Sequence, residues 1–208
     1  MSDDLQDRLD QADDLGVAPI QITEELRAVR MHLADLVPAN VLELGAARGG
    51  WCYAVAPVCS PGARFIMVDA TAYPERERAI RELYSEGYVV HWIQGYTRDA
   101  CVLAAARAAF AGQPVDVLHI DADHRLQPVL DDWSMYSTLV RPGGIVIFHD
   151  ALRPDYGVGR AIHWIRTHDP PVTCWTTIRA RDPRTMGIVI ARMAGPDPAD
   201  PAGTSGTA

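Results

Sequence analysis

Long apolar runs, paired cysteines and excess basic charge are all missing from this sequence of 208 residues. No run approaches the roughly 20 apolar residues that a membrane span needs, and the acidic start at Met1–Leu5 is unlike a secretory signal. The net charge of −8 argues against a protein that binds the phosphate backbone of nucleic acids. The four cysteines form no C-x-x-C pair. These features predict a cytoplasmic protein with reduced thiols and with neither a membrane nor a nucleic-acid partner.

Short apolar runs alternate with helical patterns over residues 39–194, which predicts a single α/β domain. Five alternations predict a doubly wound parallel sheet with helices on both faces. Two further strands predict a C-terminal hairpin that adds an antiparallel edge strand, giving seven strands in all. The predicted strands cover 40–44, 64–68, 89–93, 115–120, the run after the Pro142–Gly144 turn, 172–179 and 187–192. The predicted helices between them cover 51–58, 74–85, 99–110, 128–139 and 158–167.

The two ends of the chain differ from this pattern. Residues 1–38 carry no strand signal, and 22–36 predicts one amphipathic helix that ends before Pro38. We expect this segment either to cover the binding pocket as a lid or to pack in a homodimer. Residues 195–208 consist only of Gly, Pro, Asp, Ala, Ser and Thr, which predicts a disordered tail.

Two of the predicted strands are followed directly by aspartate and histidine residues. Asp121 and His124 follow the fourth strand, and Asp150 follows the fifth. In open α/β sheets, ligands bind beyond the carboxyl ends of the strands. If the two strands are neighbours, about 4.8 Å apart, the two carboxylates face one small volume. Carboxylates that close repel each other unless a cation lies between them, which predicts a divalent metal beside His124.

A glycine-rich turn follows the first strand. Gly45 and Gly49 let a ligand approach the backbone closely, and the helix N-terminus beyond them is electropositive. Asp69 ends the second strand, where a carboxylate can accept hydrogen bonds from ribose hydroxyls. The dinucleotide fingerprint G-x-G-x-x-G is incomplete because Ala47 replaces its second glycine, and Glu43 favours a cationic ligand. The turn therefore predicts S-adenosylmethionine, which carries a sulfonium and an ammonium group, rather than NAD.

Two sequences at the strand ends, HIDADH at 119–124 and RPGGIVIFHD at 141–150, together resemble a known enzyme group. Over residues 38–193 the chain resembles the class I S-adenosylmethionine-dependent methyltransferases, and more narrowly their metal-dependent sugar O-methyltransferase group. That group includes enzymes of macrolide and polysaccharide biosynthesis and is related to cephalosporin hydroxylase. The resemblance implies a Rossmann-like sheet of order 3-2-1-4-5-7-6. It also implies a Mg²⁺ ion held by the acid after strand four and the pair after strand five.

The resemblance assigns roles to individual residues. It implies that Asp121 and Asp150 bind the metal and that His124 is the base. A histidine ligand would also admit Mn²⁺ in place of Mg²⁺. His149 stands where many relatives have an acid, and is either a metal ligand or a neighbour of one. Cofactor contacts are expected at Glu43, Gly45, Gly49, Asp69 and Asp121, and beside the adenine at Gln94 and Thr97.

The expected reaction is the methylation of a sugar hydroxyl in a glycoside, oligosaccharide or polysaccharide precursor, and a methylmannose polysaccharide is the narrowest match. Metal coordination would stabilise the alkoxide while His124 takes the proton. A catechol O-methyltransferase is an alternative, although those enzymes typically end the fifth strand in Asp-Asn rather than in His149–Asp150. Two further functions stay open: an iron-dependent oxygenase related to cephalosporin hydroxylase, and a binding protein that has kept the fold.

Overall fold

Seven strands form one sheet in the order β3-β2-β1-β4-β5-β7-β6, in a computed structural model that describes residues 4–168, 172–182 and 185–195. The first five strands are parallel, and β7 runs antiparallel to β5 and β6. The predicted fold class, strand order and antiparallel hairpin are therefore confirmed. The strands are β1 (Asn40–Leu44), β2 (Arg64–Asp69), β3 (Val89–Gln94), β4 (Val115–Ile120), β5 (Val140–Phe148), β6 (Val172–Ile178) and β7 (Ile188–Met193).

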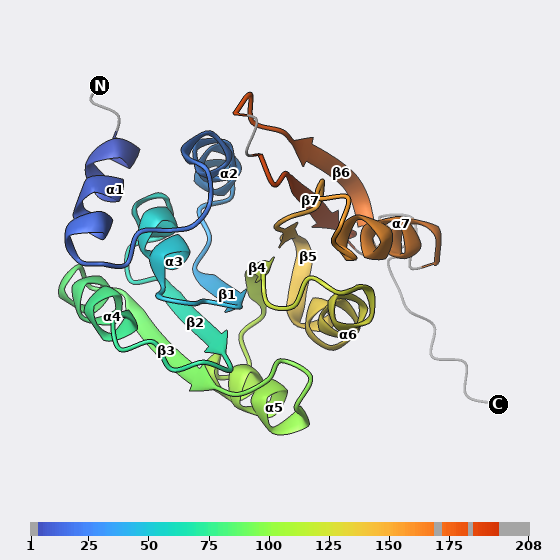
Figure 1. The fold of residues 1–208 in the computed structure, drawn as a ribbon. Coiled ribbons are helices and arrows are strands. Elements are labelled where there is room, and N and C mark those ends of the chain that lie inside the picture. Colours follow the sequence, from blue (N-terminus) through green and yellow to red (C-terminus); the bar gives the residue numbers. More distant parts are fainter. Residues whose placement is uncertain (1–3, 169–171, 183–184, 196–208) are drawn as a thin grey trace.

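Helices cover both faces of the sheet, so the domain has three layers (Figure 1). The helices α1–α4 pack on one face and α5–α7 on the other. None of the helices in the described ranges is long and apolar enough to cross a membrane. The helices are α1 (Asp4–Asp14), α2 (Thr23–Leu36), α3 (Gly50–Val55), α4 (Arg76–Ser85), α5 (Ala100–Ala109), α6 (Leu126–Tyr136) and α7 (Val158–His168), with short 3₁₀ turns at Ala56–Val58 and Ser137–Leu139.

The strands are apolar throughout because each contributes side chains to both cores. Successive residues of a strand point to opposite faces. In β1, Val41 packs into the core under α2 and α3, whereas Leu42 packs into the core under α5 and α6. Every residue of β4 is buried. This double burial explains why the central strands appear in the sequence as short continuous apolar runs.

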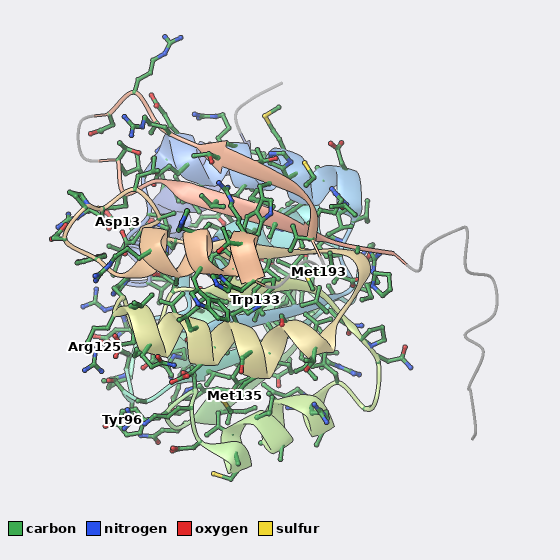
Figure 2. The ribbon with its side chains drawn as sticks, turned by 90° about the vertical axis from the view of Figure 1, so that its right-hand side faces the viewer. Asp13, Tyr96, Arg125, Trp133, Met135 and Met193 are labelled. Atoms are coloured by element: carbon green, nitrogen blue, oxygen red, sulfur yellow. The ribbon has the colours of Figure 1, made fainter. Side chains whose placement is uncertain are left out.

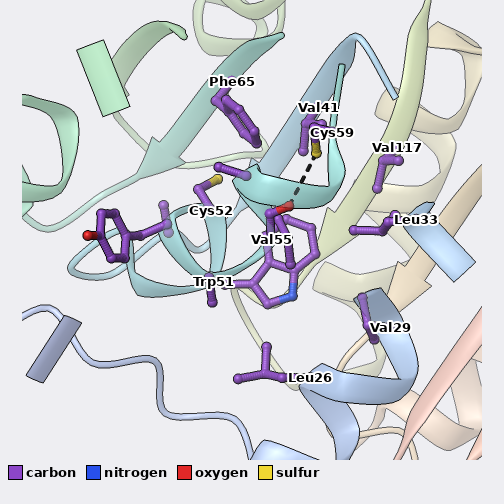
Figure 3. Close-up of a cluster of buried hydrophobic side chains, with 14 of the residues drawn as sticks. Leu26, Val29, Leu33, Val41, Trp51, Cys52, Val55, Cys59, Phe65 and Val117 are labelled. Atoms are coloured by element: carbon purple, nitrogen blue, oxygen red, sulfur yellow. Dashed lines mark hydrogen bonds between the residues drawn. The ribbon is translucent and has the colours of Figure 1, made fainter. Parts of the chain in front are cut away.

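The core under α2 and α3 holds the first face together (Figure 3). Leu26, Val29 and Leu33 lie at helical spacing on α2 and are fully buried against this core. Trp51 of α3 packs into the same cluster, where 2% of its surface is exposed. Burying a leucine or valine side chain stabilises a fold by about 2 kcal/mol. The stripe therefore fixes α2 on this face of the sheet.

On the opposite face, α6 and α7 lie side by side with Trp133 between them (Figure 2). Arg125, just before α6, lies at one end of this face, and Met193, at the end of β7, lies at the other. Arg125 marks the end where the parallel strands finish. The antiparallel β7 finishes at the other end, as its direction requires.

The N-terminal segment differs from the prediction, which gave it one helix. α1 precedes α2 and has a strongly polar sequence that buries few side chains. It is held by Arg8, which is 6% exposed, donates a hydrogen bond to the Tyr53 carbonyl (2.9 Å) and pairs with Glu86. Because its partners are distant in the sequence, α1 has little local apolar pattern from which a helix could be predicted. The predicted disorder at 196–208 lies outside the described residues.

Candidate functional site

The strand order reverses direction between β1 and β4, and a crevice opens there beyond their carboxyl ends. A cavity of about 910 Å³ occupies this place. Its lining comes from the turn after β1, the ends of β4 and β5, and the linker between α1 and α2. Among the residues singled out in the sequence, Glu43, Gly45, Asp121, His124, His149 and Asp150 line it.

Asp121, His124 and Asp150 form a compact cluster in this cavity. One ligand atom from each lies within 4.8 Å of the others. His124 Nε2 is 2.7 Å from Asp150 Oδ2 and 3.4 Å from Asp121 Oδ1. The cause is the register of the sheet, because β4 and β5 are paired neighbours whose last residues, Ile120 and Phe148, lie opposite each other. The structure thus brings the two predicted carboxylates together.

Asp150 adopts a left-handed backbone conformation with a φ of +55°. Aspartate tolerates this region better than most residues, although it remains uncommon outside glycine. The next residue, Ala151, donates a backbone hydrogen bond to the Gly187 carbonyl (2.9 Å), just before β7. The chain therefore bends as it leaves β5, and the hydrogen bond to Gly187 stabilises this bend. The bend turns the Asp150 side chain toward His124.

His149 is almost fully buried behind the two carboxylates. Its Nδ1 lies 3.3 Å from Asp121 Oδ1 and 3.4 Å from Asp150 Oδ2. Burial lowers the pKa of this imidazole, but the two carboxylates outweigh that effect and raise the pKa of His149 to about 10. The carboxylates of Asp121 and Asp150 also raise the pKa of His124 to about 9.

The pKa values of the two carboxyl groups are lowered, whereas those of the two imidazoles are raised. Burial raises their pKa values, but His124 and His149 together hold the pKa of Asp121 well below its usual value and that of Asp150 at about 2. In the protein alone, two positively charged imidazoles thus balance two negative carboxylates. Such a cluster of acidic oxygens in a cavity has the composition of a divalent-cation site.

The glycine turn approaches β4 closely. Gly45 has a φ of +89°, and a Cβ atom there would lie 2.1 Å from the Asp121 carbonyl oxygen. Gly49 has a φ of +81° and precedes the first turn of α3. Glu43, just before the turn, is buried and accepts a hydrogen bond from the Cys52 thiol (3.0 Å). Its other oxygen lies 3.2 Å from Nδ1 of the buried His119.

Asp69 shapes the same turn from β2. One carboxylate oxygen accepts a hydrogen bond from the Ala47 amide (2.7 Å) and the other from the Thr71 amide (2.7 Å). Asp69, Gly49, Gln94 and Thr97 are not among the residues that line the cavity. Asp69 and Gln94 are paired at the ends of β2 and β3, whereas the Thr97 carbonyl accepts a hydrogen bond from the Tyr136 hydroxyl of α6 (2.8 Å). The expected contacts of Gly49 with the methionine end of the cofactor, of Asp69 with the ribose, and of Gln94 and Thr97 with the adenine stay predictions.

Two residues of the N-terminal segment reach the site, although the sequence did not single them out. Gln21 donates a hydrogen bond to Asp121 Oδ2 (2.8 Å), across 100 positions of sequence. Glu25 is completely buried, with Oε2 4.0 Å from His149 Nε2. Neither residue belongs to a motif. Only the packing of α2 against the sheet places them here.

Two aromatic contacts also surround the site. The ring of Trp51 stacks on His119, with centroids 4.1 Å apart, and Tyr156 lies 4.6 Å from the His124 ring. Trp51 and Tyr156 both line the cavity. They limit how far His119 and His124 can move.

Comparison with known proteins identifies the family. A family model described as "Methyltransferase domain" matches residues 42–151, just over half of the chain, from β1 to the bend after β5. The chain belongs to this methyltransferase family. The matched region contains both strand ends that carry Asp121 and Asp150.

Solved structures of methyltransferases share the fold of nearly the whole chain. The O-methyltransferase TomG from Streptomyces achromogenes, in complex with SAM, is 18% identical, with a TM-score of 0.69 and coverage of 94% of this chain and 91% of that one. A putative caffeoyl-CoA O-methyltransferase from Staphylococcus aureus is 16% identical, with a TM-score of 0.69 and 93% coverage of both chains. An O-methyltransferase from Bacillus cereus, in complex with SAH, is 17% identical, with a TM-score of 0.63 and coverage of 91% and 90%.

A shorter match links this methyltransferase to the uncharacterized protein R132 of Acanthamoeba polyphaga mimivirus. The two are 34% identical over 64 residues, which is 31% of this chain and 28% of the viral protein. The chain therefore matches less than a third of that protein's length.

Proposed function

We propose that this methyltransferase transfers the methyl group of S-adenosylmethionine to a sugar hydroxyl, with a divalent cation held by Asp121 and Asp150. The observation that carries the proposal is the cluster of Asp121, His124 and Asp150 in a cavity beside the glycine turn. The family assignment supports methyl transfer. S-adenosylmethionine as the donor is supported by TomG and the Bacillus cereus enzyme, whose structures contain SAM and SAH.

The residues present suit Mg²⁺, and they also admit Mn²⁺. Asp121 and Asp150 offer carboxylate oxygens, the ligands that Mg²⁺ prefers, and the nearby Nδ1 of His149 adds the nitrogen donor that Mn²⁺ accepts. A cation there would stabilise the negative charge that develops on the acceptor oxygen. His149 could serve either as a ligand or as a neighbour that orients the two carboxylates.

His124 is the candidate base. With a pKa of about 9 it is protonated at neutral pH in the protein alone, because both carboxylates stabilise its charge. A base must be free to accept a proton, so His124 needs those carboxylates to be neutralised by another positive charge. It would then accept the hydroxyl proton while the oxygen forms a bond to the methyl carbon and the carbon–sulfur bond of the donor breaks.

The cavity supports a polar acceptor such as a sugar. Its lining includes the charged side chains of Glu24, Arg48 and Asp182, which can bind several hydroxyl groups. Two adjacent hydroxyls of one sugar could chelate the cation, which would select the position that is methylated. A methylated mannoside, as in methylmannose polysaccharides, is the narrowest acceptor that we propose.

A catechol is the second candidate acceptor. It also presents two adjacent oxygens, and the Staphylococcus aureus relative in fold is named as a putative caffeoyl-CoA O-methyltransferase. Tyr156, beside His124, offers an aromatic surface against which a catechol ring could stack.

The test is a methylation assay with S-adenosylmethionine and either mannosides or catechol, with Mg²⁺ or with excess chelator. We expect mannoside products heavier by one CH₂, loss of turnover in chelator and recovery with Mg²⁺. D121N and D150N should lose activity. D123N is the matched control, because the nearby carboxylate of Asp123 pairs with Arg125 outside the cluster. Full turnover in chelator would contradict the metal, and preferred catechol methylation would favour the second acceptor. A hydroxylated product in a parallel reaction with Fe²⁺ and O₂ would indicate the oxygenase.

A further inference from the structure

The buried carboxylate of Glu25 faces the ring nitrogen of His149 that points away from the cluster. Nδ1 of His149 lies 3.3 and 3.4 Å from the oxygens of Asp121 and Asp150. Nε2 lies 4.0 Å from Glu25 Oε2. Glu25 is 0% exposed, and His149 is 5% exposed. One imidazole thus has carboxylates on both sides, from α2 and from the ends of β4 and β5.

The two oxygens of Glu25 have different surroundings. Oε1 accepts hydrogen bonds from the Thr185 hydroxyl (2.6 Å) and the Gly187 amide (2.8 Å), both next to β7. Oε2 is buried without a hydrogen-bond partner among the described residues, and so are both ring nitrogens of His149. A buried charge is costly unless an opposite charge compensates it. The atom of the cluster that faces Oε2 is Nε2 of His149, 4.0 Å away.

We propose, on the basis of the function proposed above, that Glu25 is a positioning residue for the cation-binding cluster. It acts through His149 and keeps Nδ1 of the ring directed at Asp121 and Asp150. Metal sites commonly include a carboxylate that orients a histidine from outside the ligands, and its loss typically weakens metal binding 10- to 100-fold. Glu25 occupies the corresponding place whether His149 binds the cation directly or only orients the carboxylates.

This role makes the N-terminal segment part of the reaction centre. Gln21, four residues before Glu25, donates a hydrogen bond to Asp121 Oδ2 (2.8 Å). The start of α2 therefore contacts the cluster twice, once at a carboxylate and once behind the histidine. Of the two roles expected for residues 1–38, these contacts favour one at the pocket.

A purely structural role for Glu25 is the competing explanation, because Oε1 also fastens α2 to the hairpin. Figure 1 shows α2 beside the loop that joins β6 and β7, where this bond is made. The variants E25Q and T185V separate the two roles. E25Q removes the charge that faces His149, whereas T185V removes a hydrogen bond to the hairpin and keeps that charge.

The decisive measurement is nuclear magnetic resonance of ¹⁵N-labelled histidine in the metal-free full chain, with the His149 signals assigned by H149N. We expect E25Q to shift the His149 ring-nitrogen signals and T185V to leave them at wild-type positions. Calorimetric titration with Mg²⁺ alone should give an affinity about 10-fold or more weaker for E25Q, and close to wild type for T185V.

Unchanged His149 signals in E25Q, or equal shifts in E25Q and T185V, would overturn the role of Glu25. If E25Q does not fold, E25D replaces it. E25D keeps the carboxylate but shortens the side chain by one methylene, which moves the carboxylate away from His149. Unchanged His149 signals in E25D would therefore overturn the role as well. A wild-type protein that fails to bind Mg²⁺ while E25Q still shifts His149 would contradict the proposed function and leave the positioning of His149 intact.

Discussion

Gly45 lies where the turn after β1 comes closest to β4, on the wall of the cavity. From the sequence, we expected Gly45 to let a ligand approach the backbone. In the structure a Cβ atom on Gly45 would lie 2.1 Å from the Asp121 carbonyl oxygen and 2.6 Å from the Ala122 Cα. The missing side chain therefore makes room for the protein's own β4 end, and it fixes where Asp121 lies.

G45A should lower the free energy of unfolding by more than a glycine-to-alanine change at a site that has the same backbone strain but no close neighbour. G87A is the matched control, because Gly87 has a φ of +90°, against +89° for Gly45, and nothing lies within 4 Å of its Cβ position. Left-handed strain costs alanine roughly 1–2 kcal/mol, so we expect about that loss for G87A and at least about 2 kcal/mol more for G45A. Urea denaturation measures both, and equal losses would contradict the close approach.

At the scale of elements, the parallel strands were predictable and the N-terminal arrangement was not. Strands buried on both faces appear as continuous apolar runs, and the acids after β4 and β5 meet because parallel neighbours end at one edge. The sequence could not place α1, whose anchor Arg8 depends on distant partners on α3 and after α4. The same holds for Gln21, which is 100 residues from Asp121.

Gly50 sets the path of the linker between α1 and α2. A Cβ atom there would lie 2.2 Å from the Val17 carbonyl oxygen and 2.7 Å from the Pro19 nitrogen. G50A should therefore push the linker away from α3 and weaken the hydrogen bond from Gln21 to Asp121. Hydrogen–deuterium exchange should increase over residues 15–22 and stay unchanged in β4. Exchange in the linker that equals wild type would contradict this packing.

For the molecule as a whole, the cluster of two carboxylates and two imidazoles couples stability to pH. Burial opposes the charge on His149, but Asp121 and Asp150 raise its pKa from 6.5 to about 10 on folding. The stabilisation from its proton is complete below pH 6.5 and is lost as the pH rises through about 10. Asp150 contributes in the opposite sense, because its pKa falls from 3.8 to about 2, so its stabilisation is lost only in strong acid.

H149N should therefore lower the melting temperature of the metal-free protein most near pH 6.5. The difference from wild type should shrink between pH 6.5 and about 10, as wild-type His149 loses its proton. Thermal unfolding in chelator across this range measures the effect. A difference that stays constant with pH would show that His149 does not carry the raised pKa.

The most direct test of the central claim is a crystal structure of the protein with S-adenosylhomocysteine and Mn²⁺, whose anomalous scattering locates the ion. Our account predicts an anomalous peak within bonding distance of both Asp121 and Asp150, beside the sulfur of the bound product. No peak there, with His124 still paired to Asp150, would contradict a cation-dependent methyl transfer at this site.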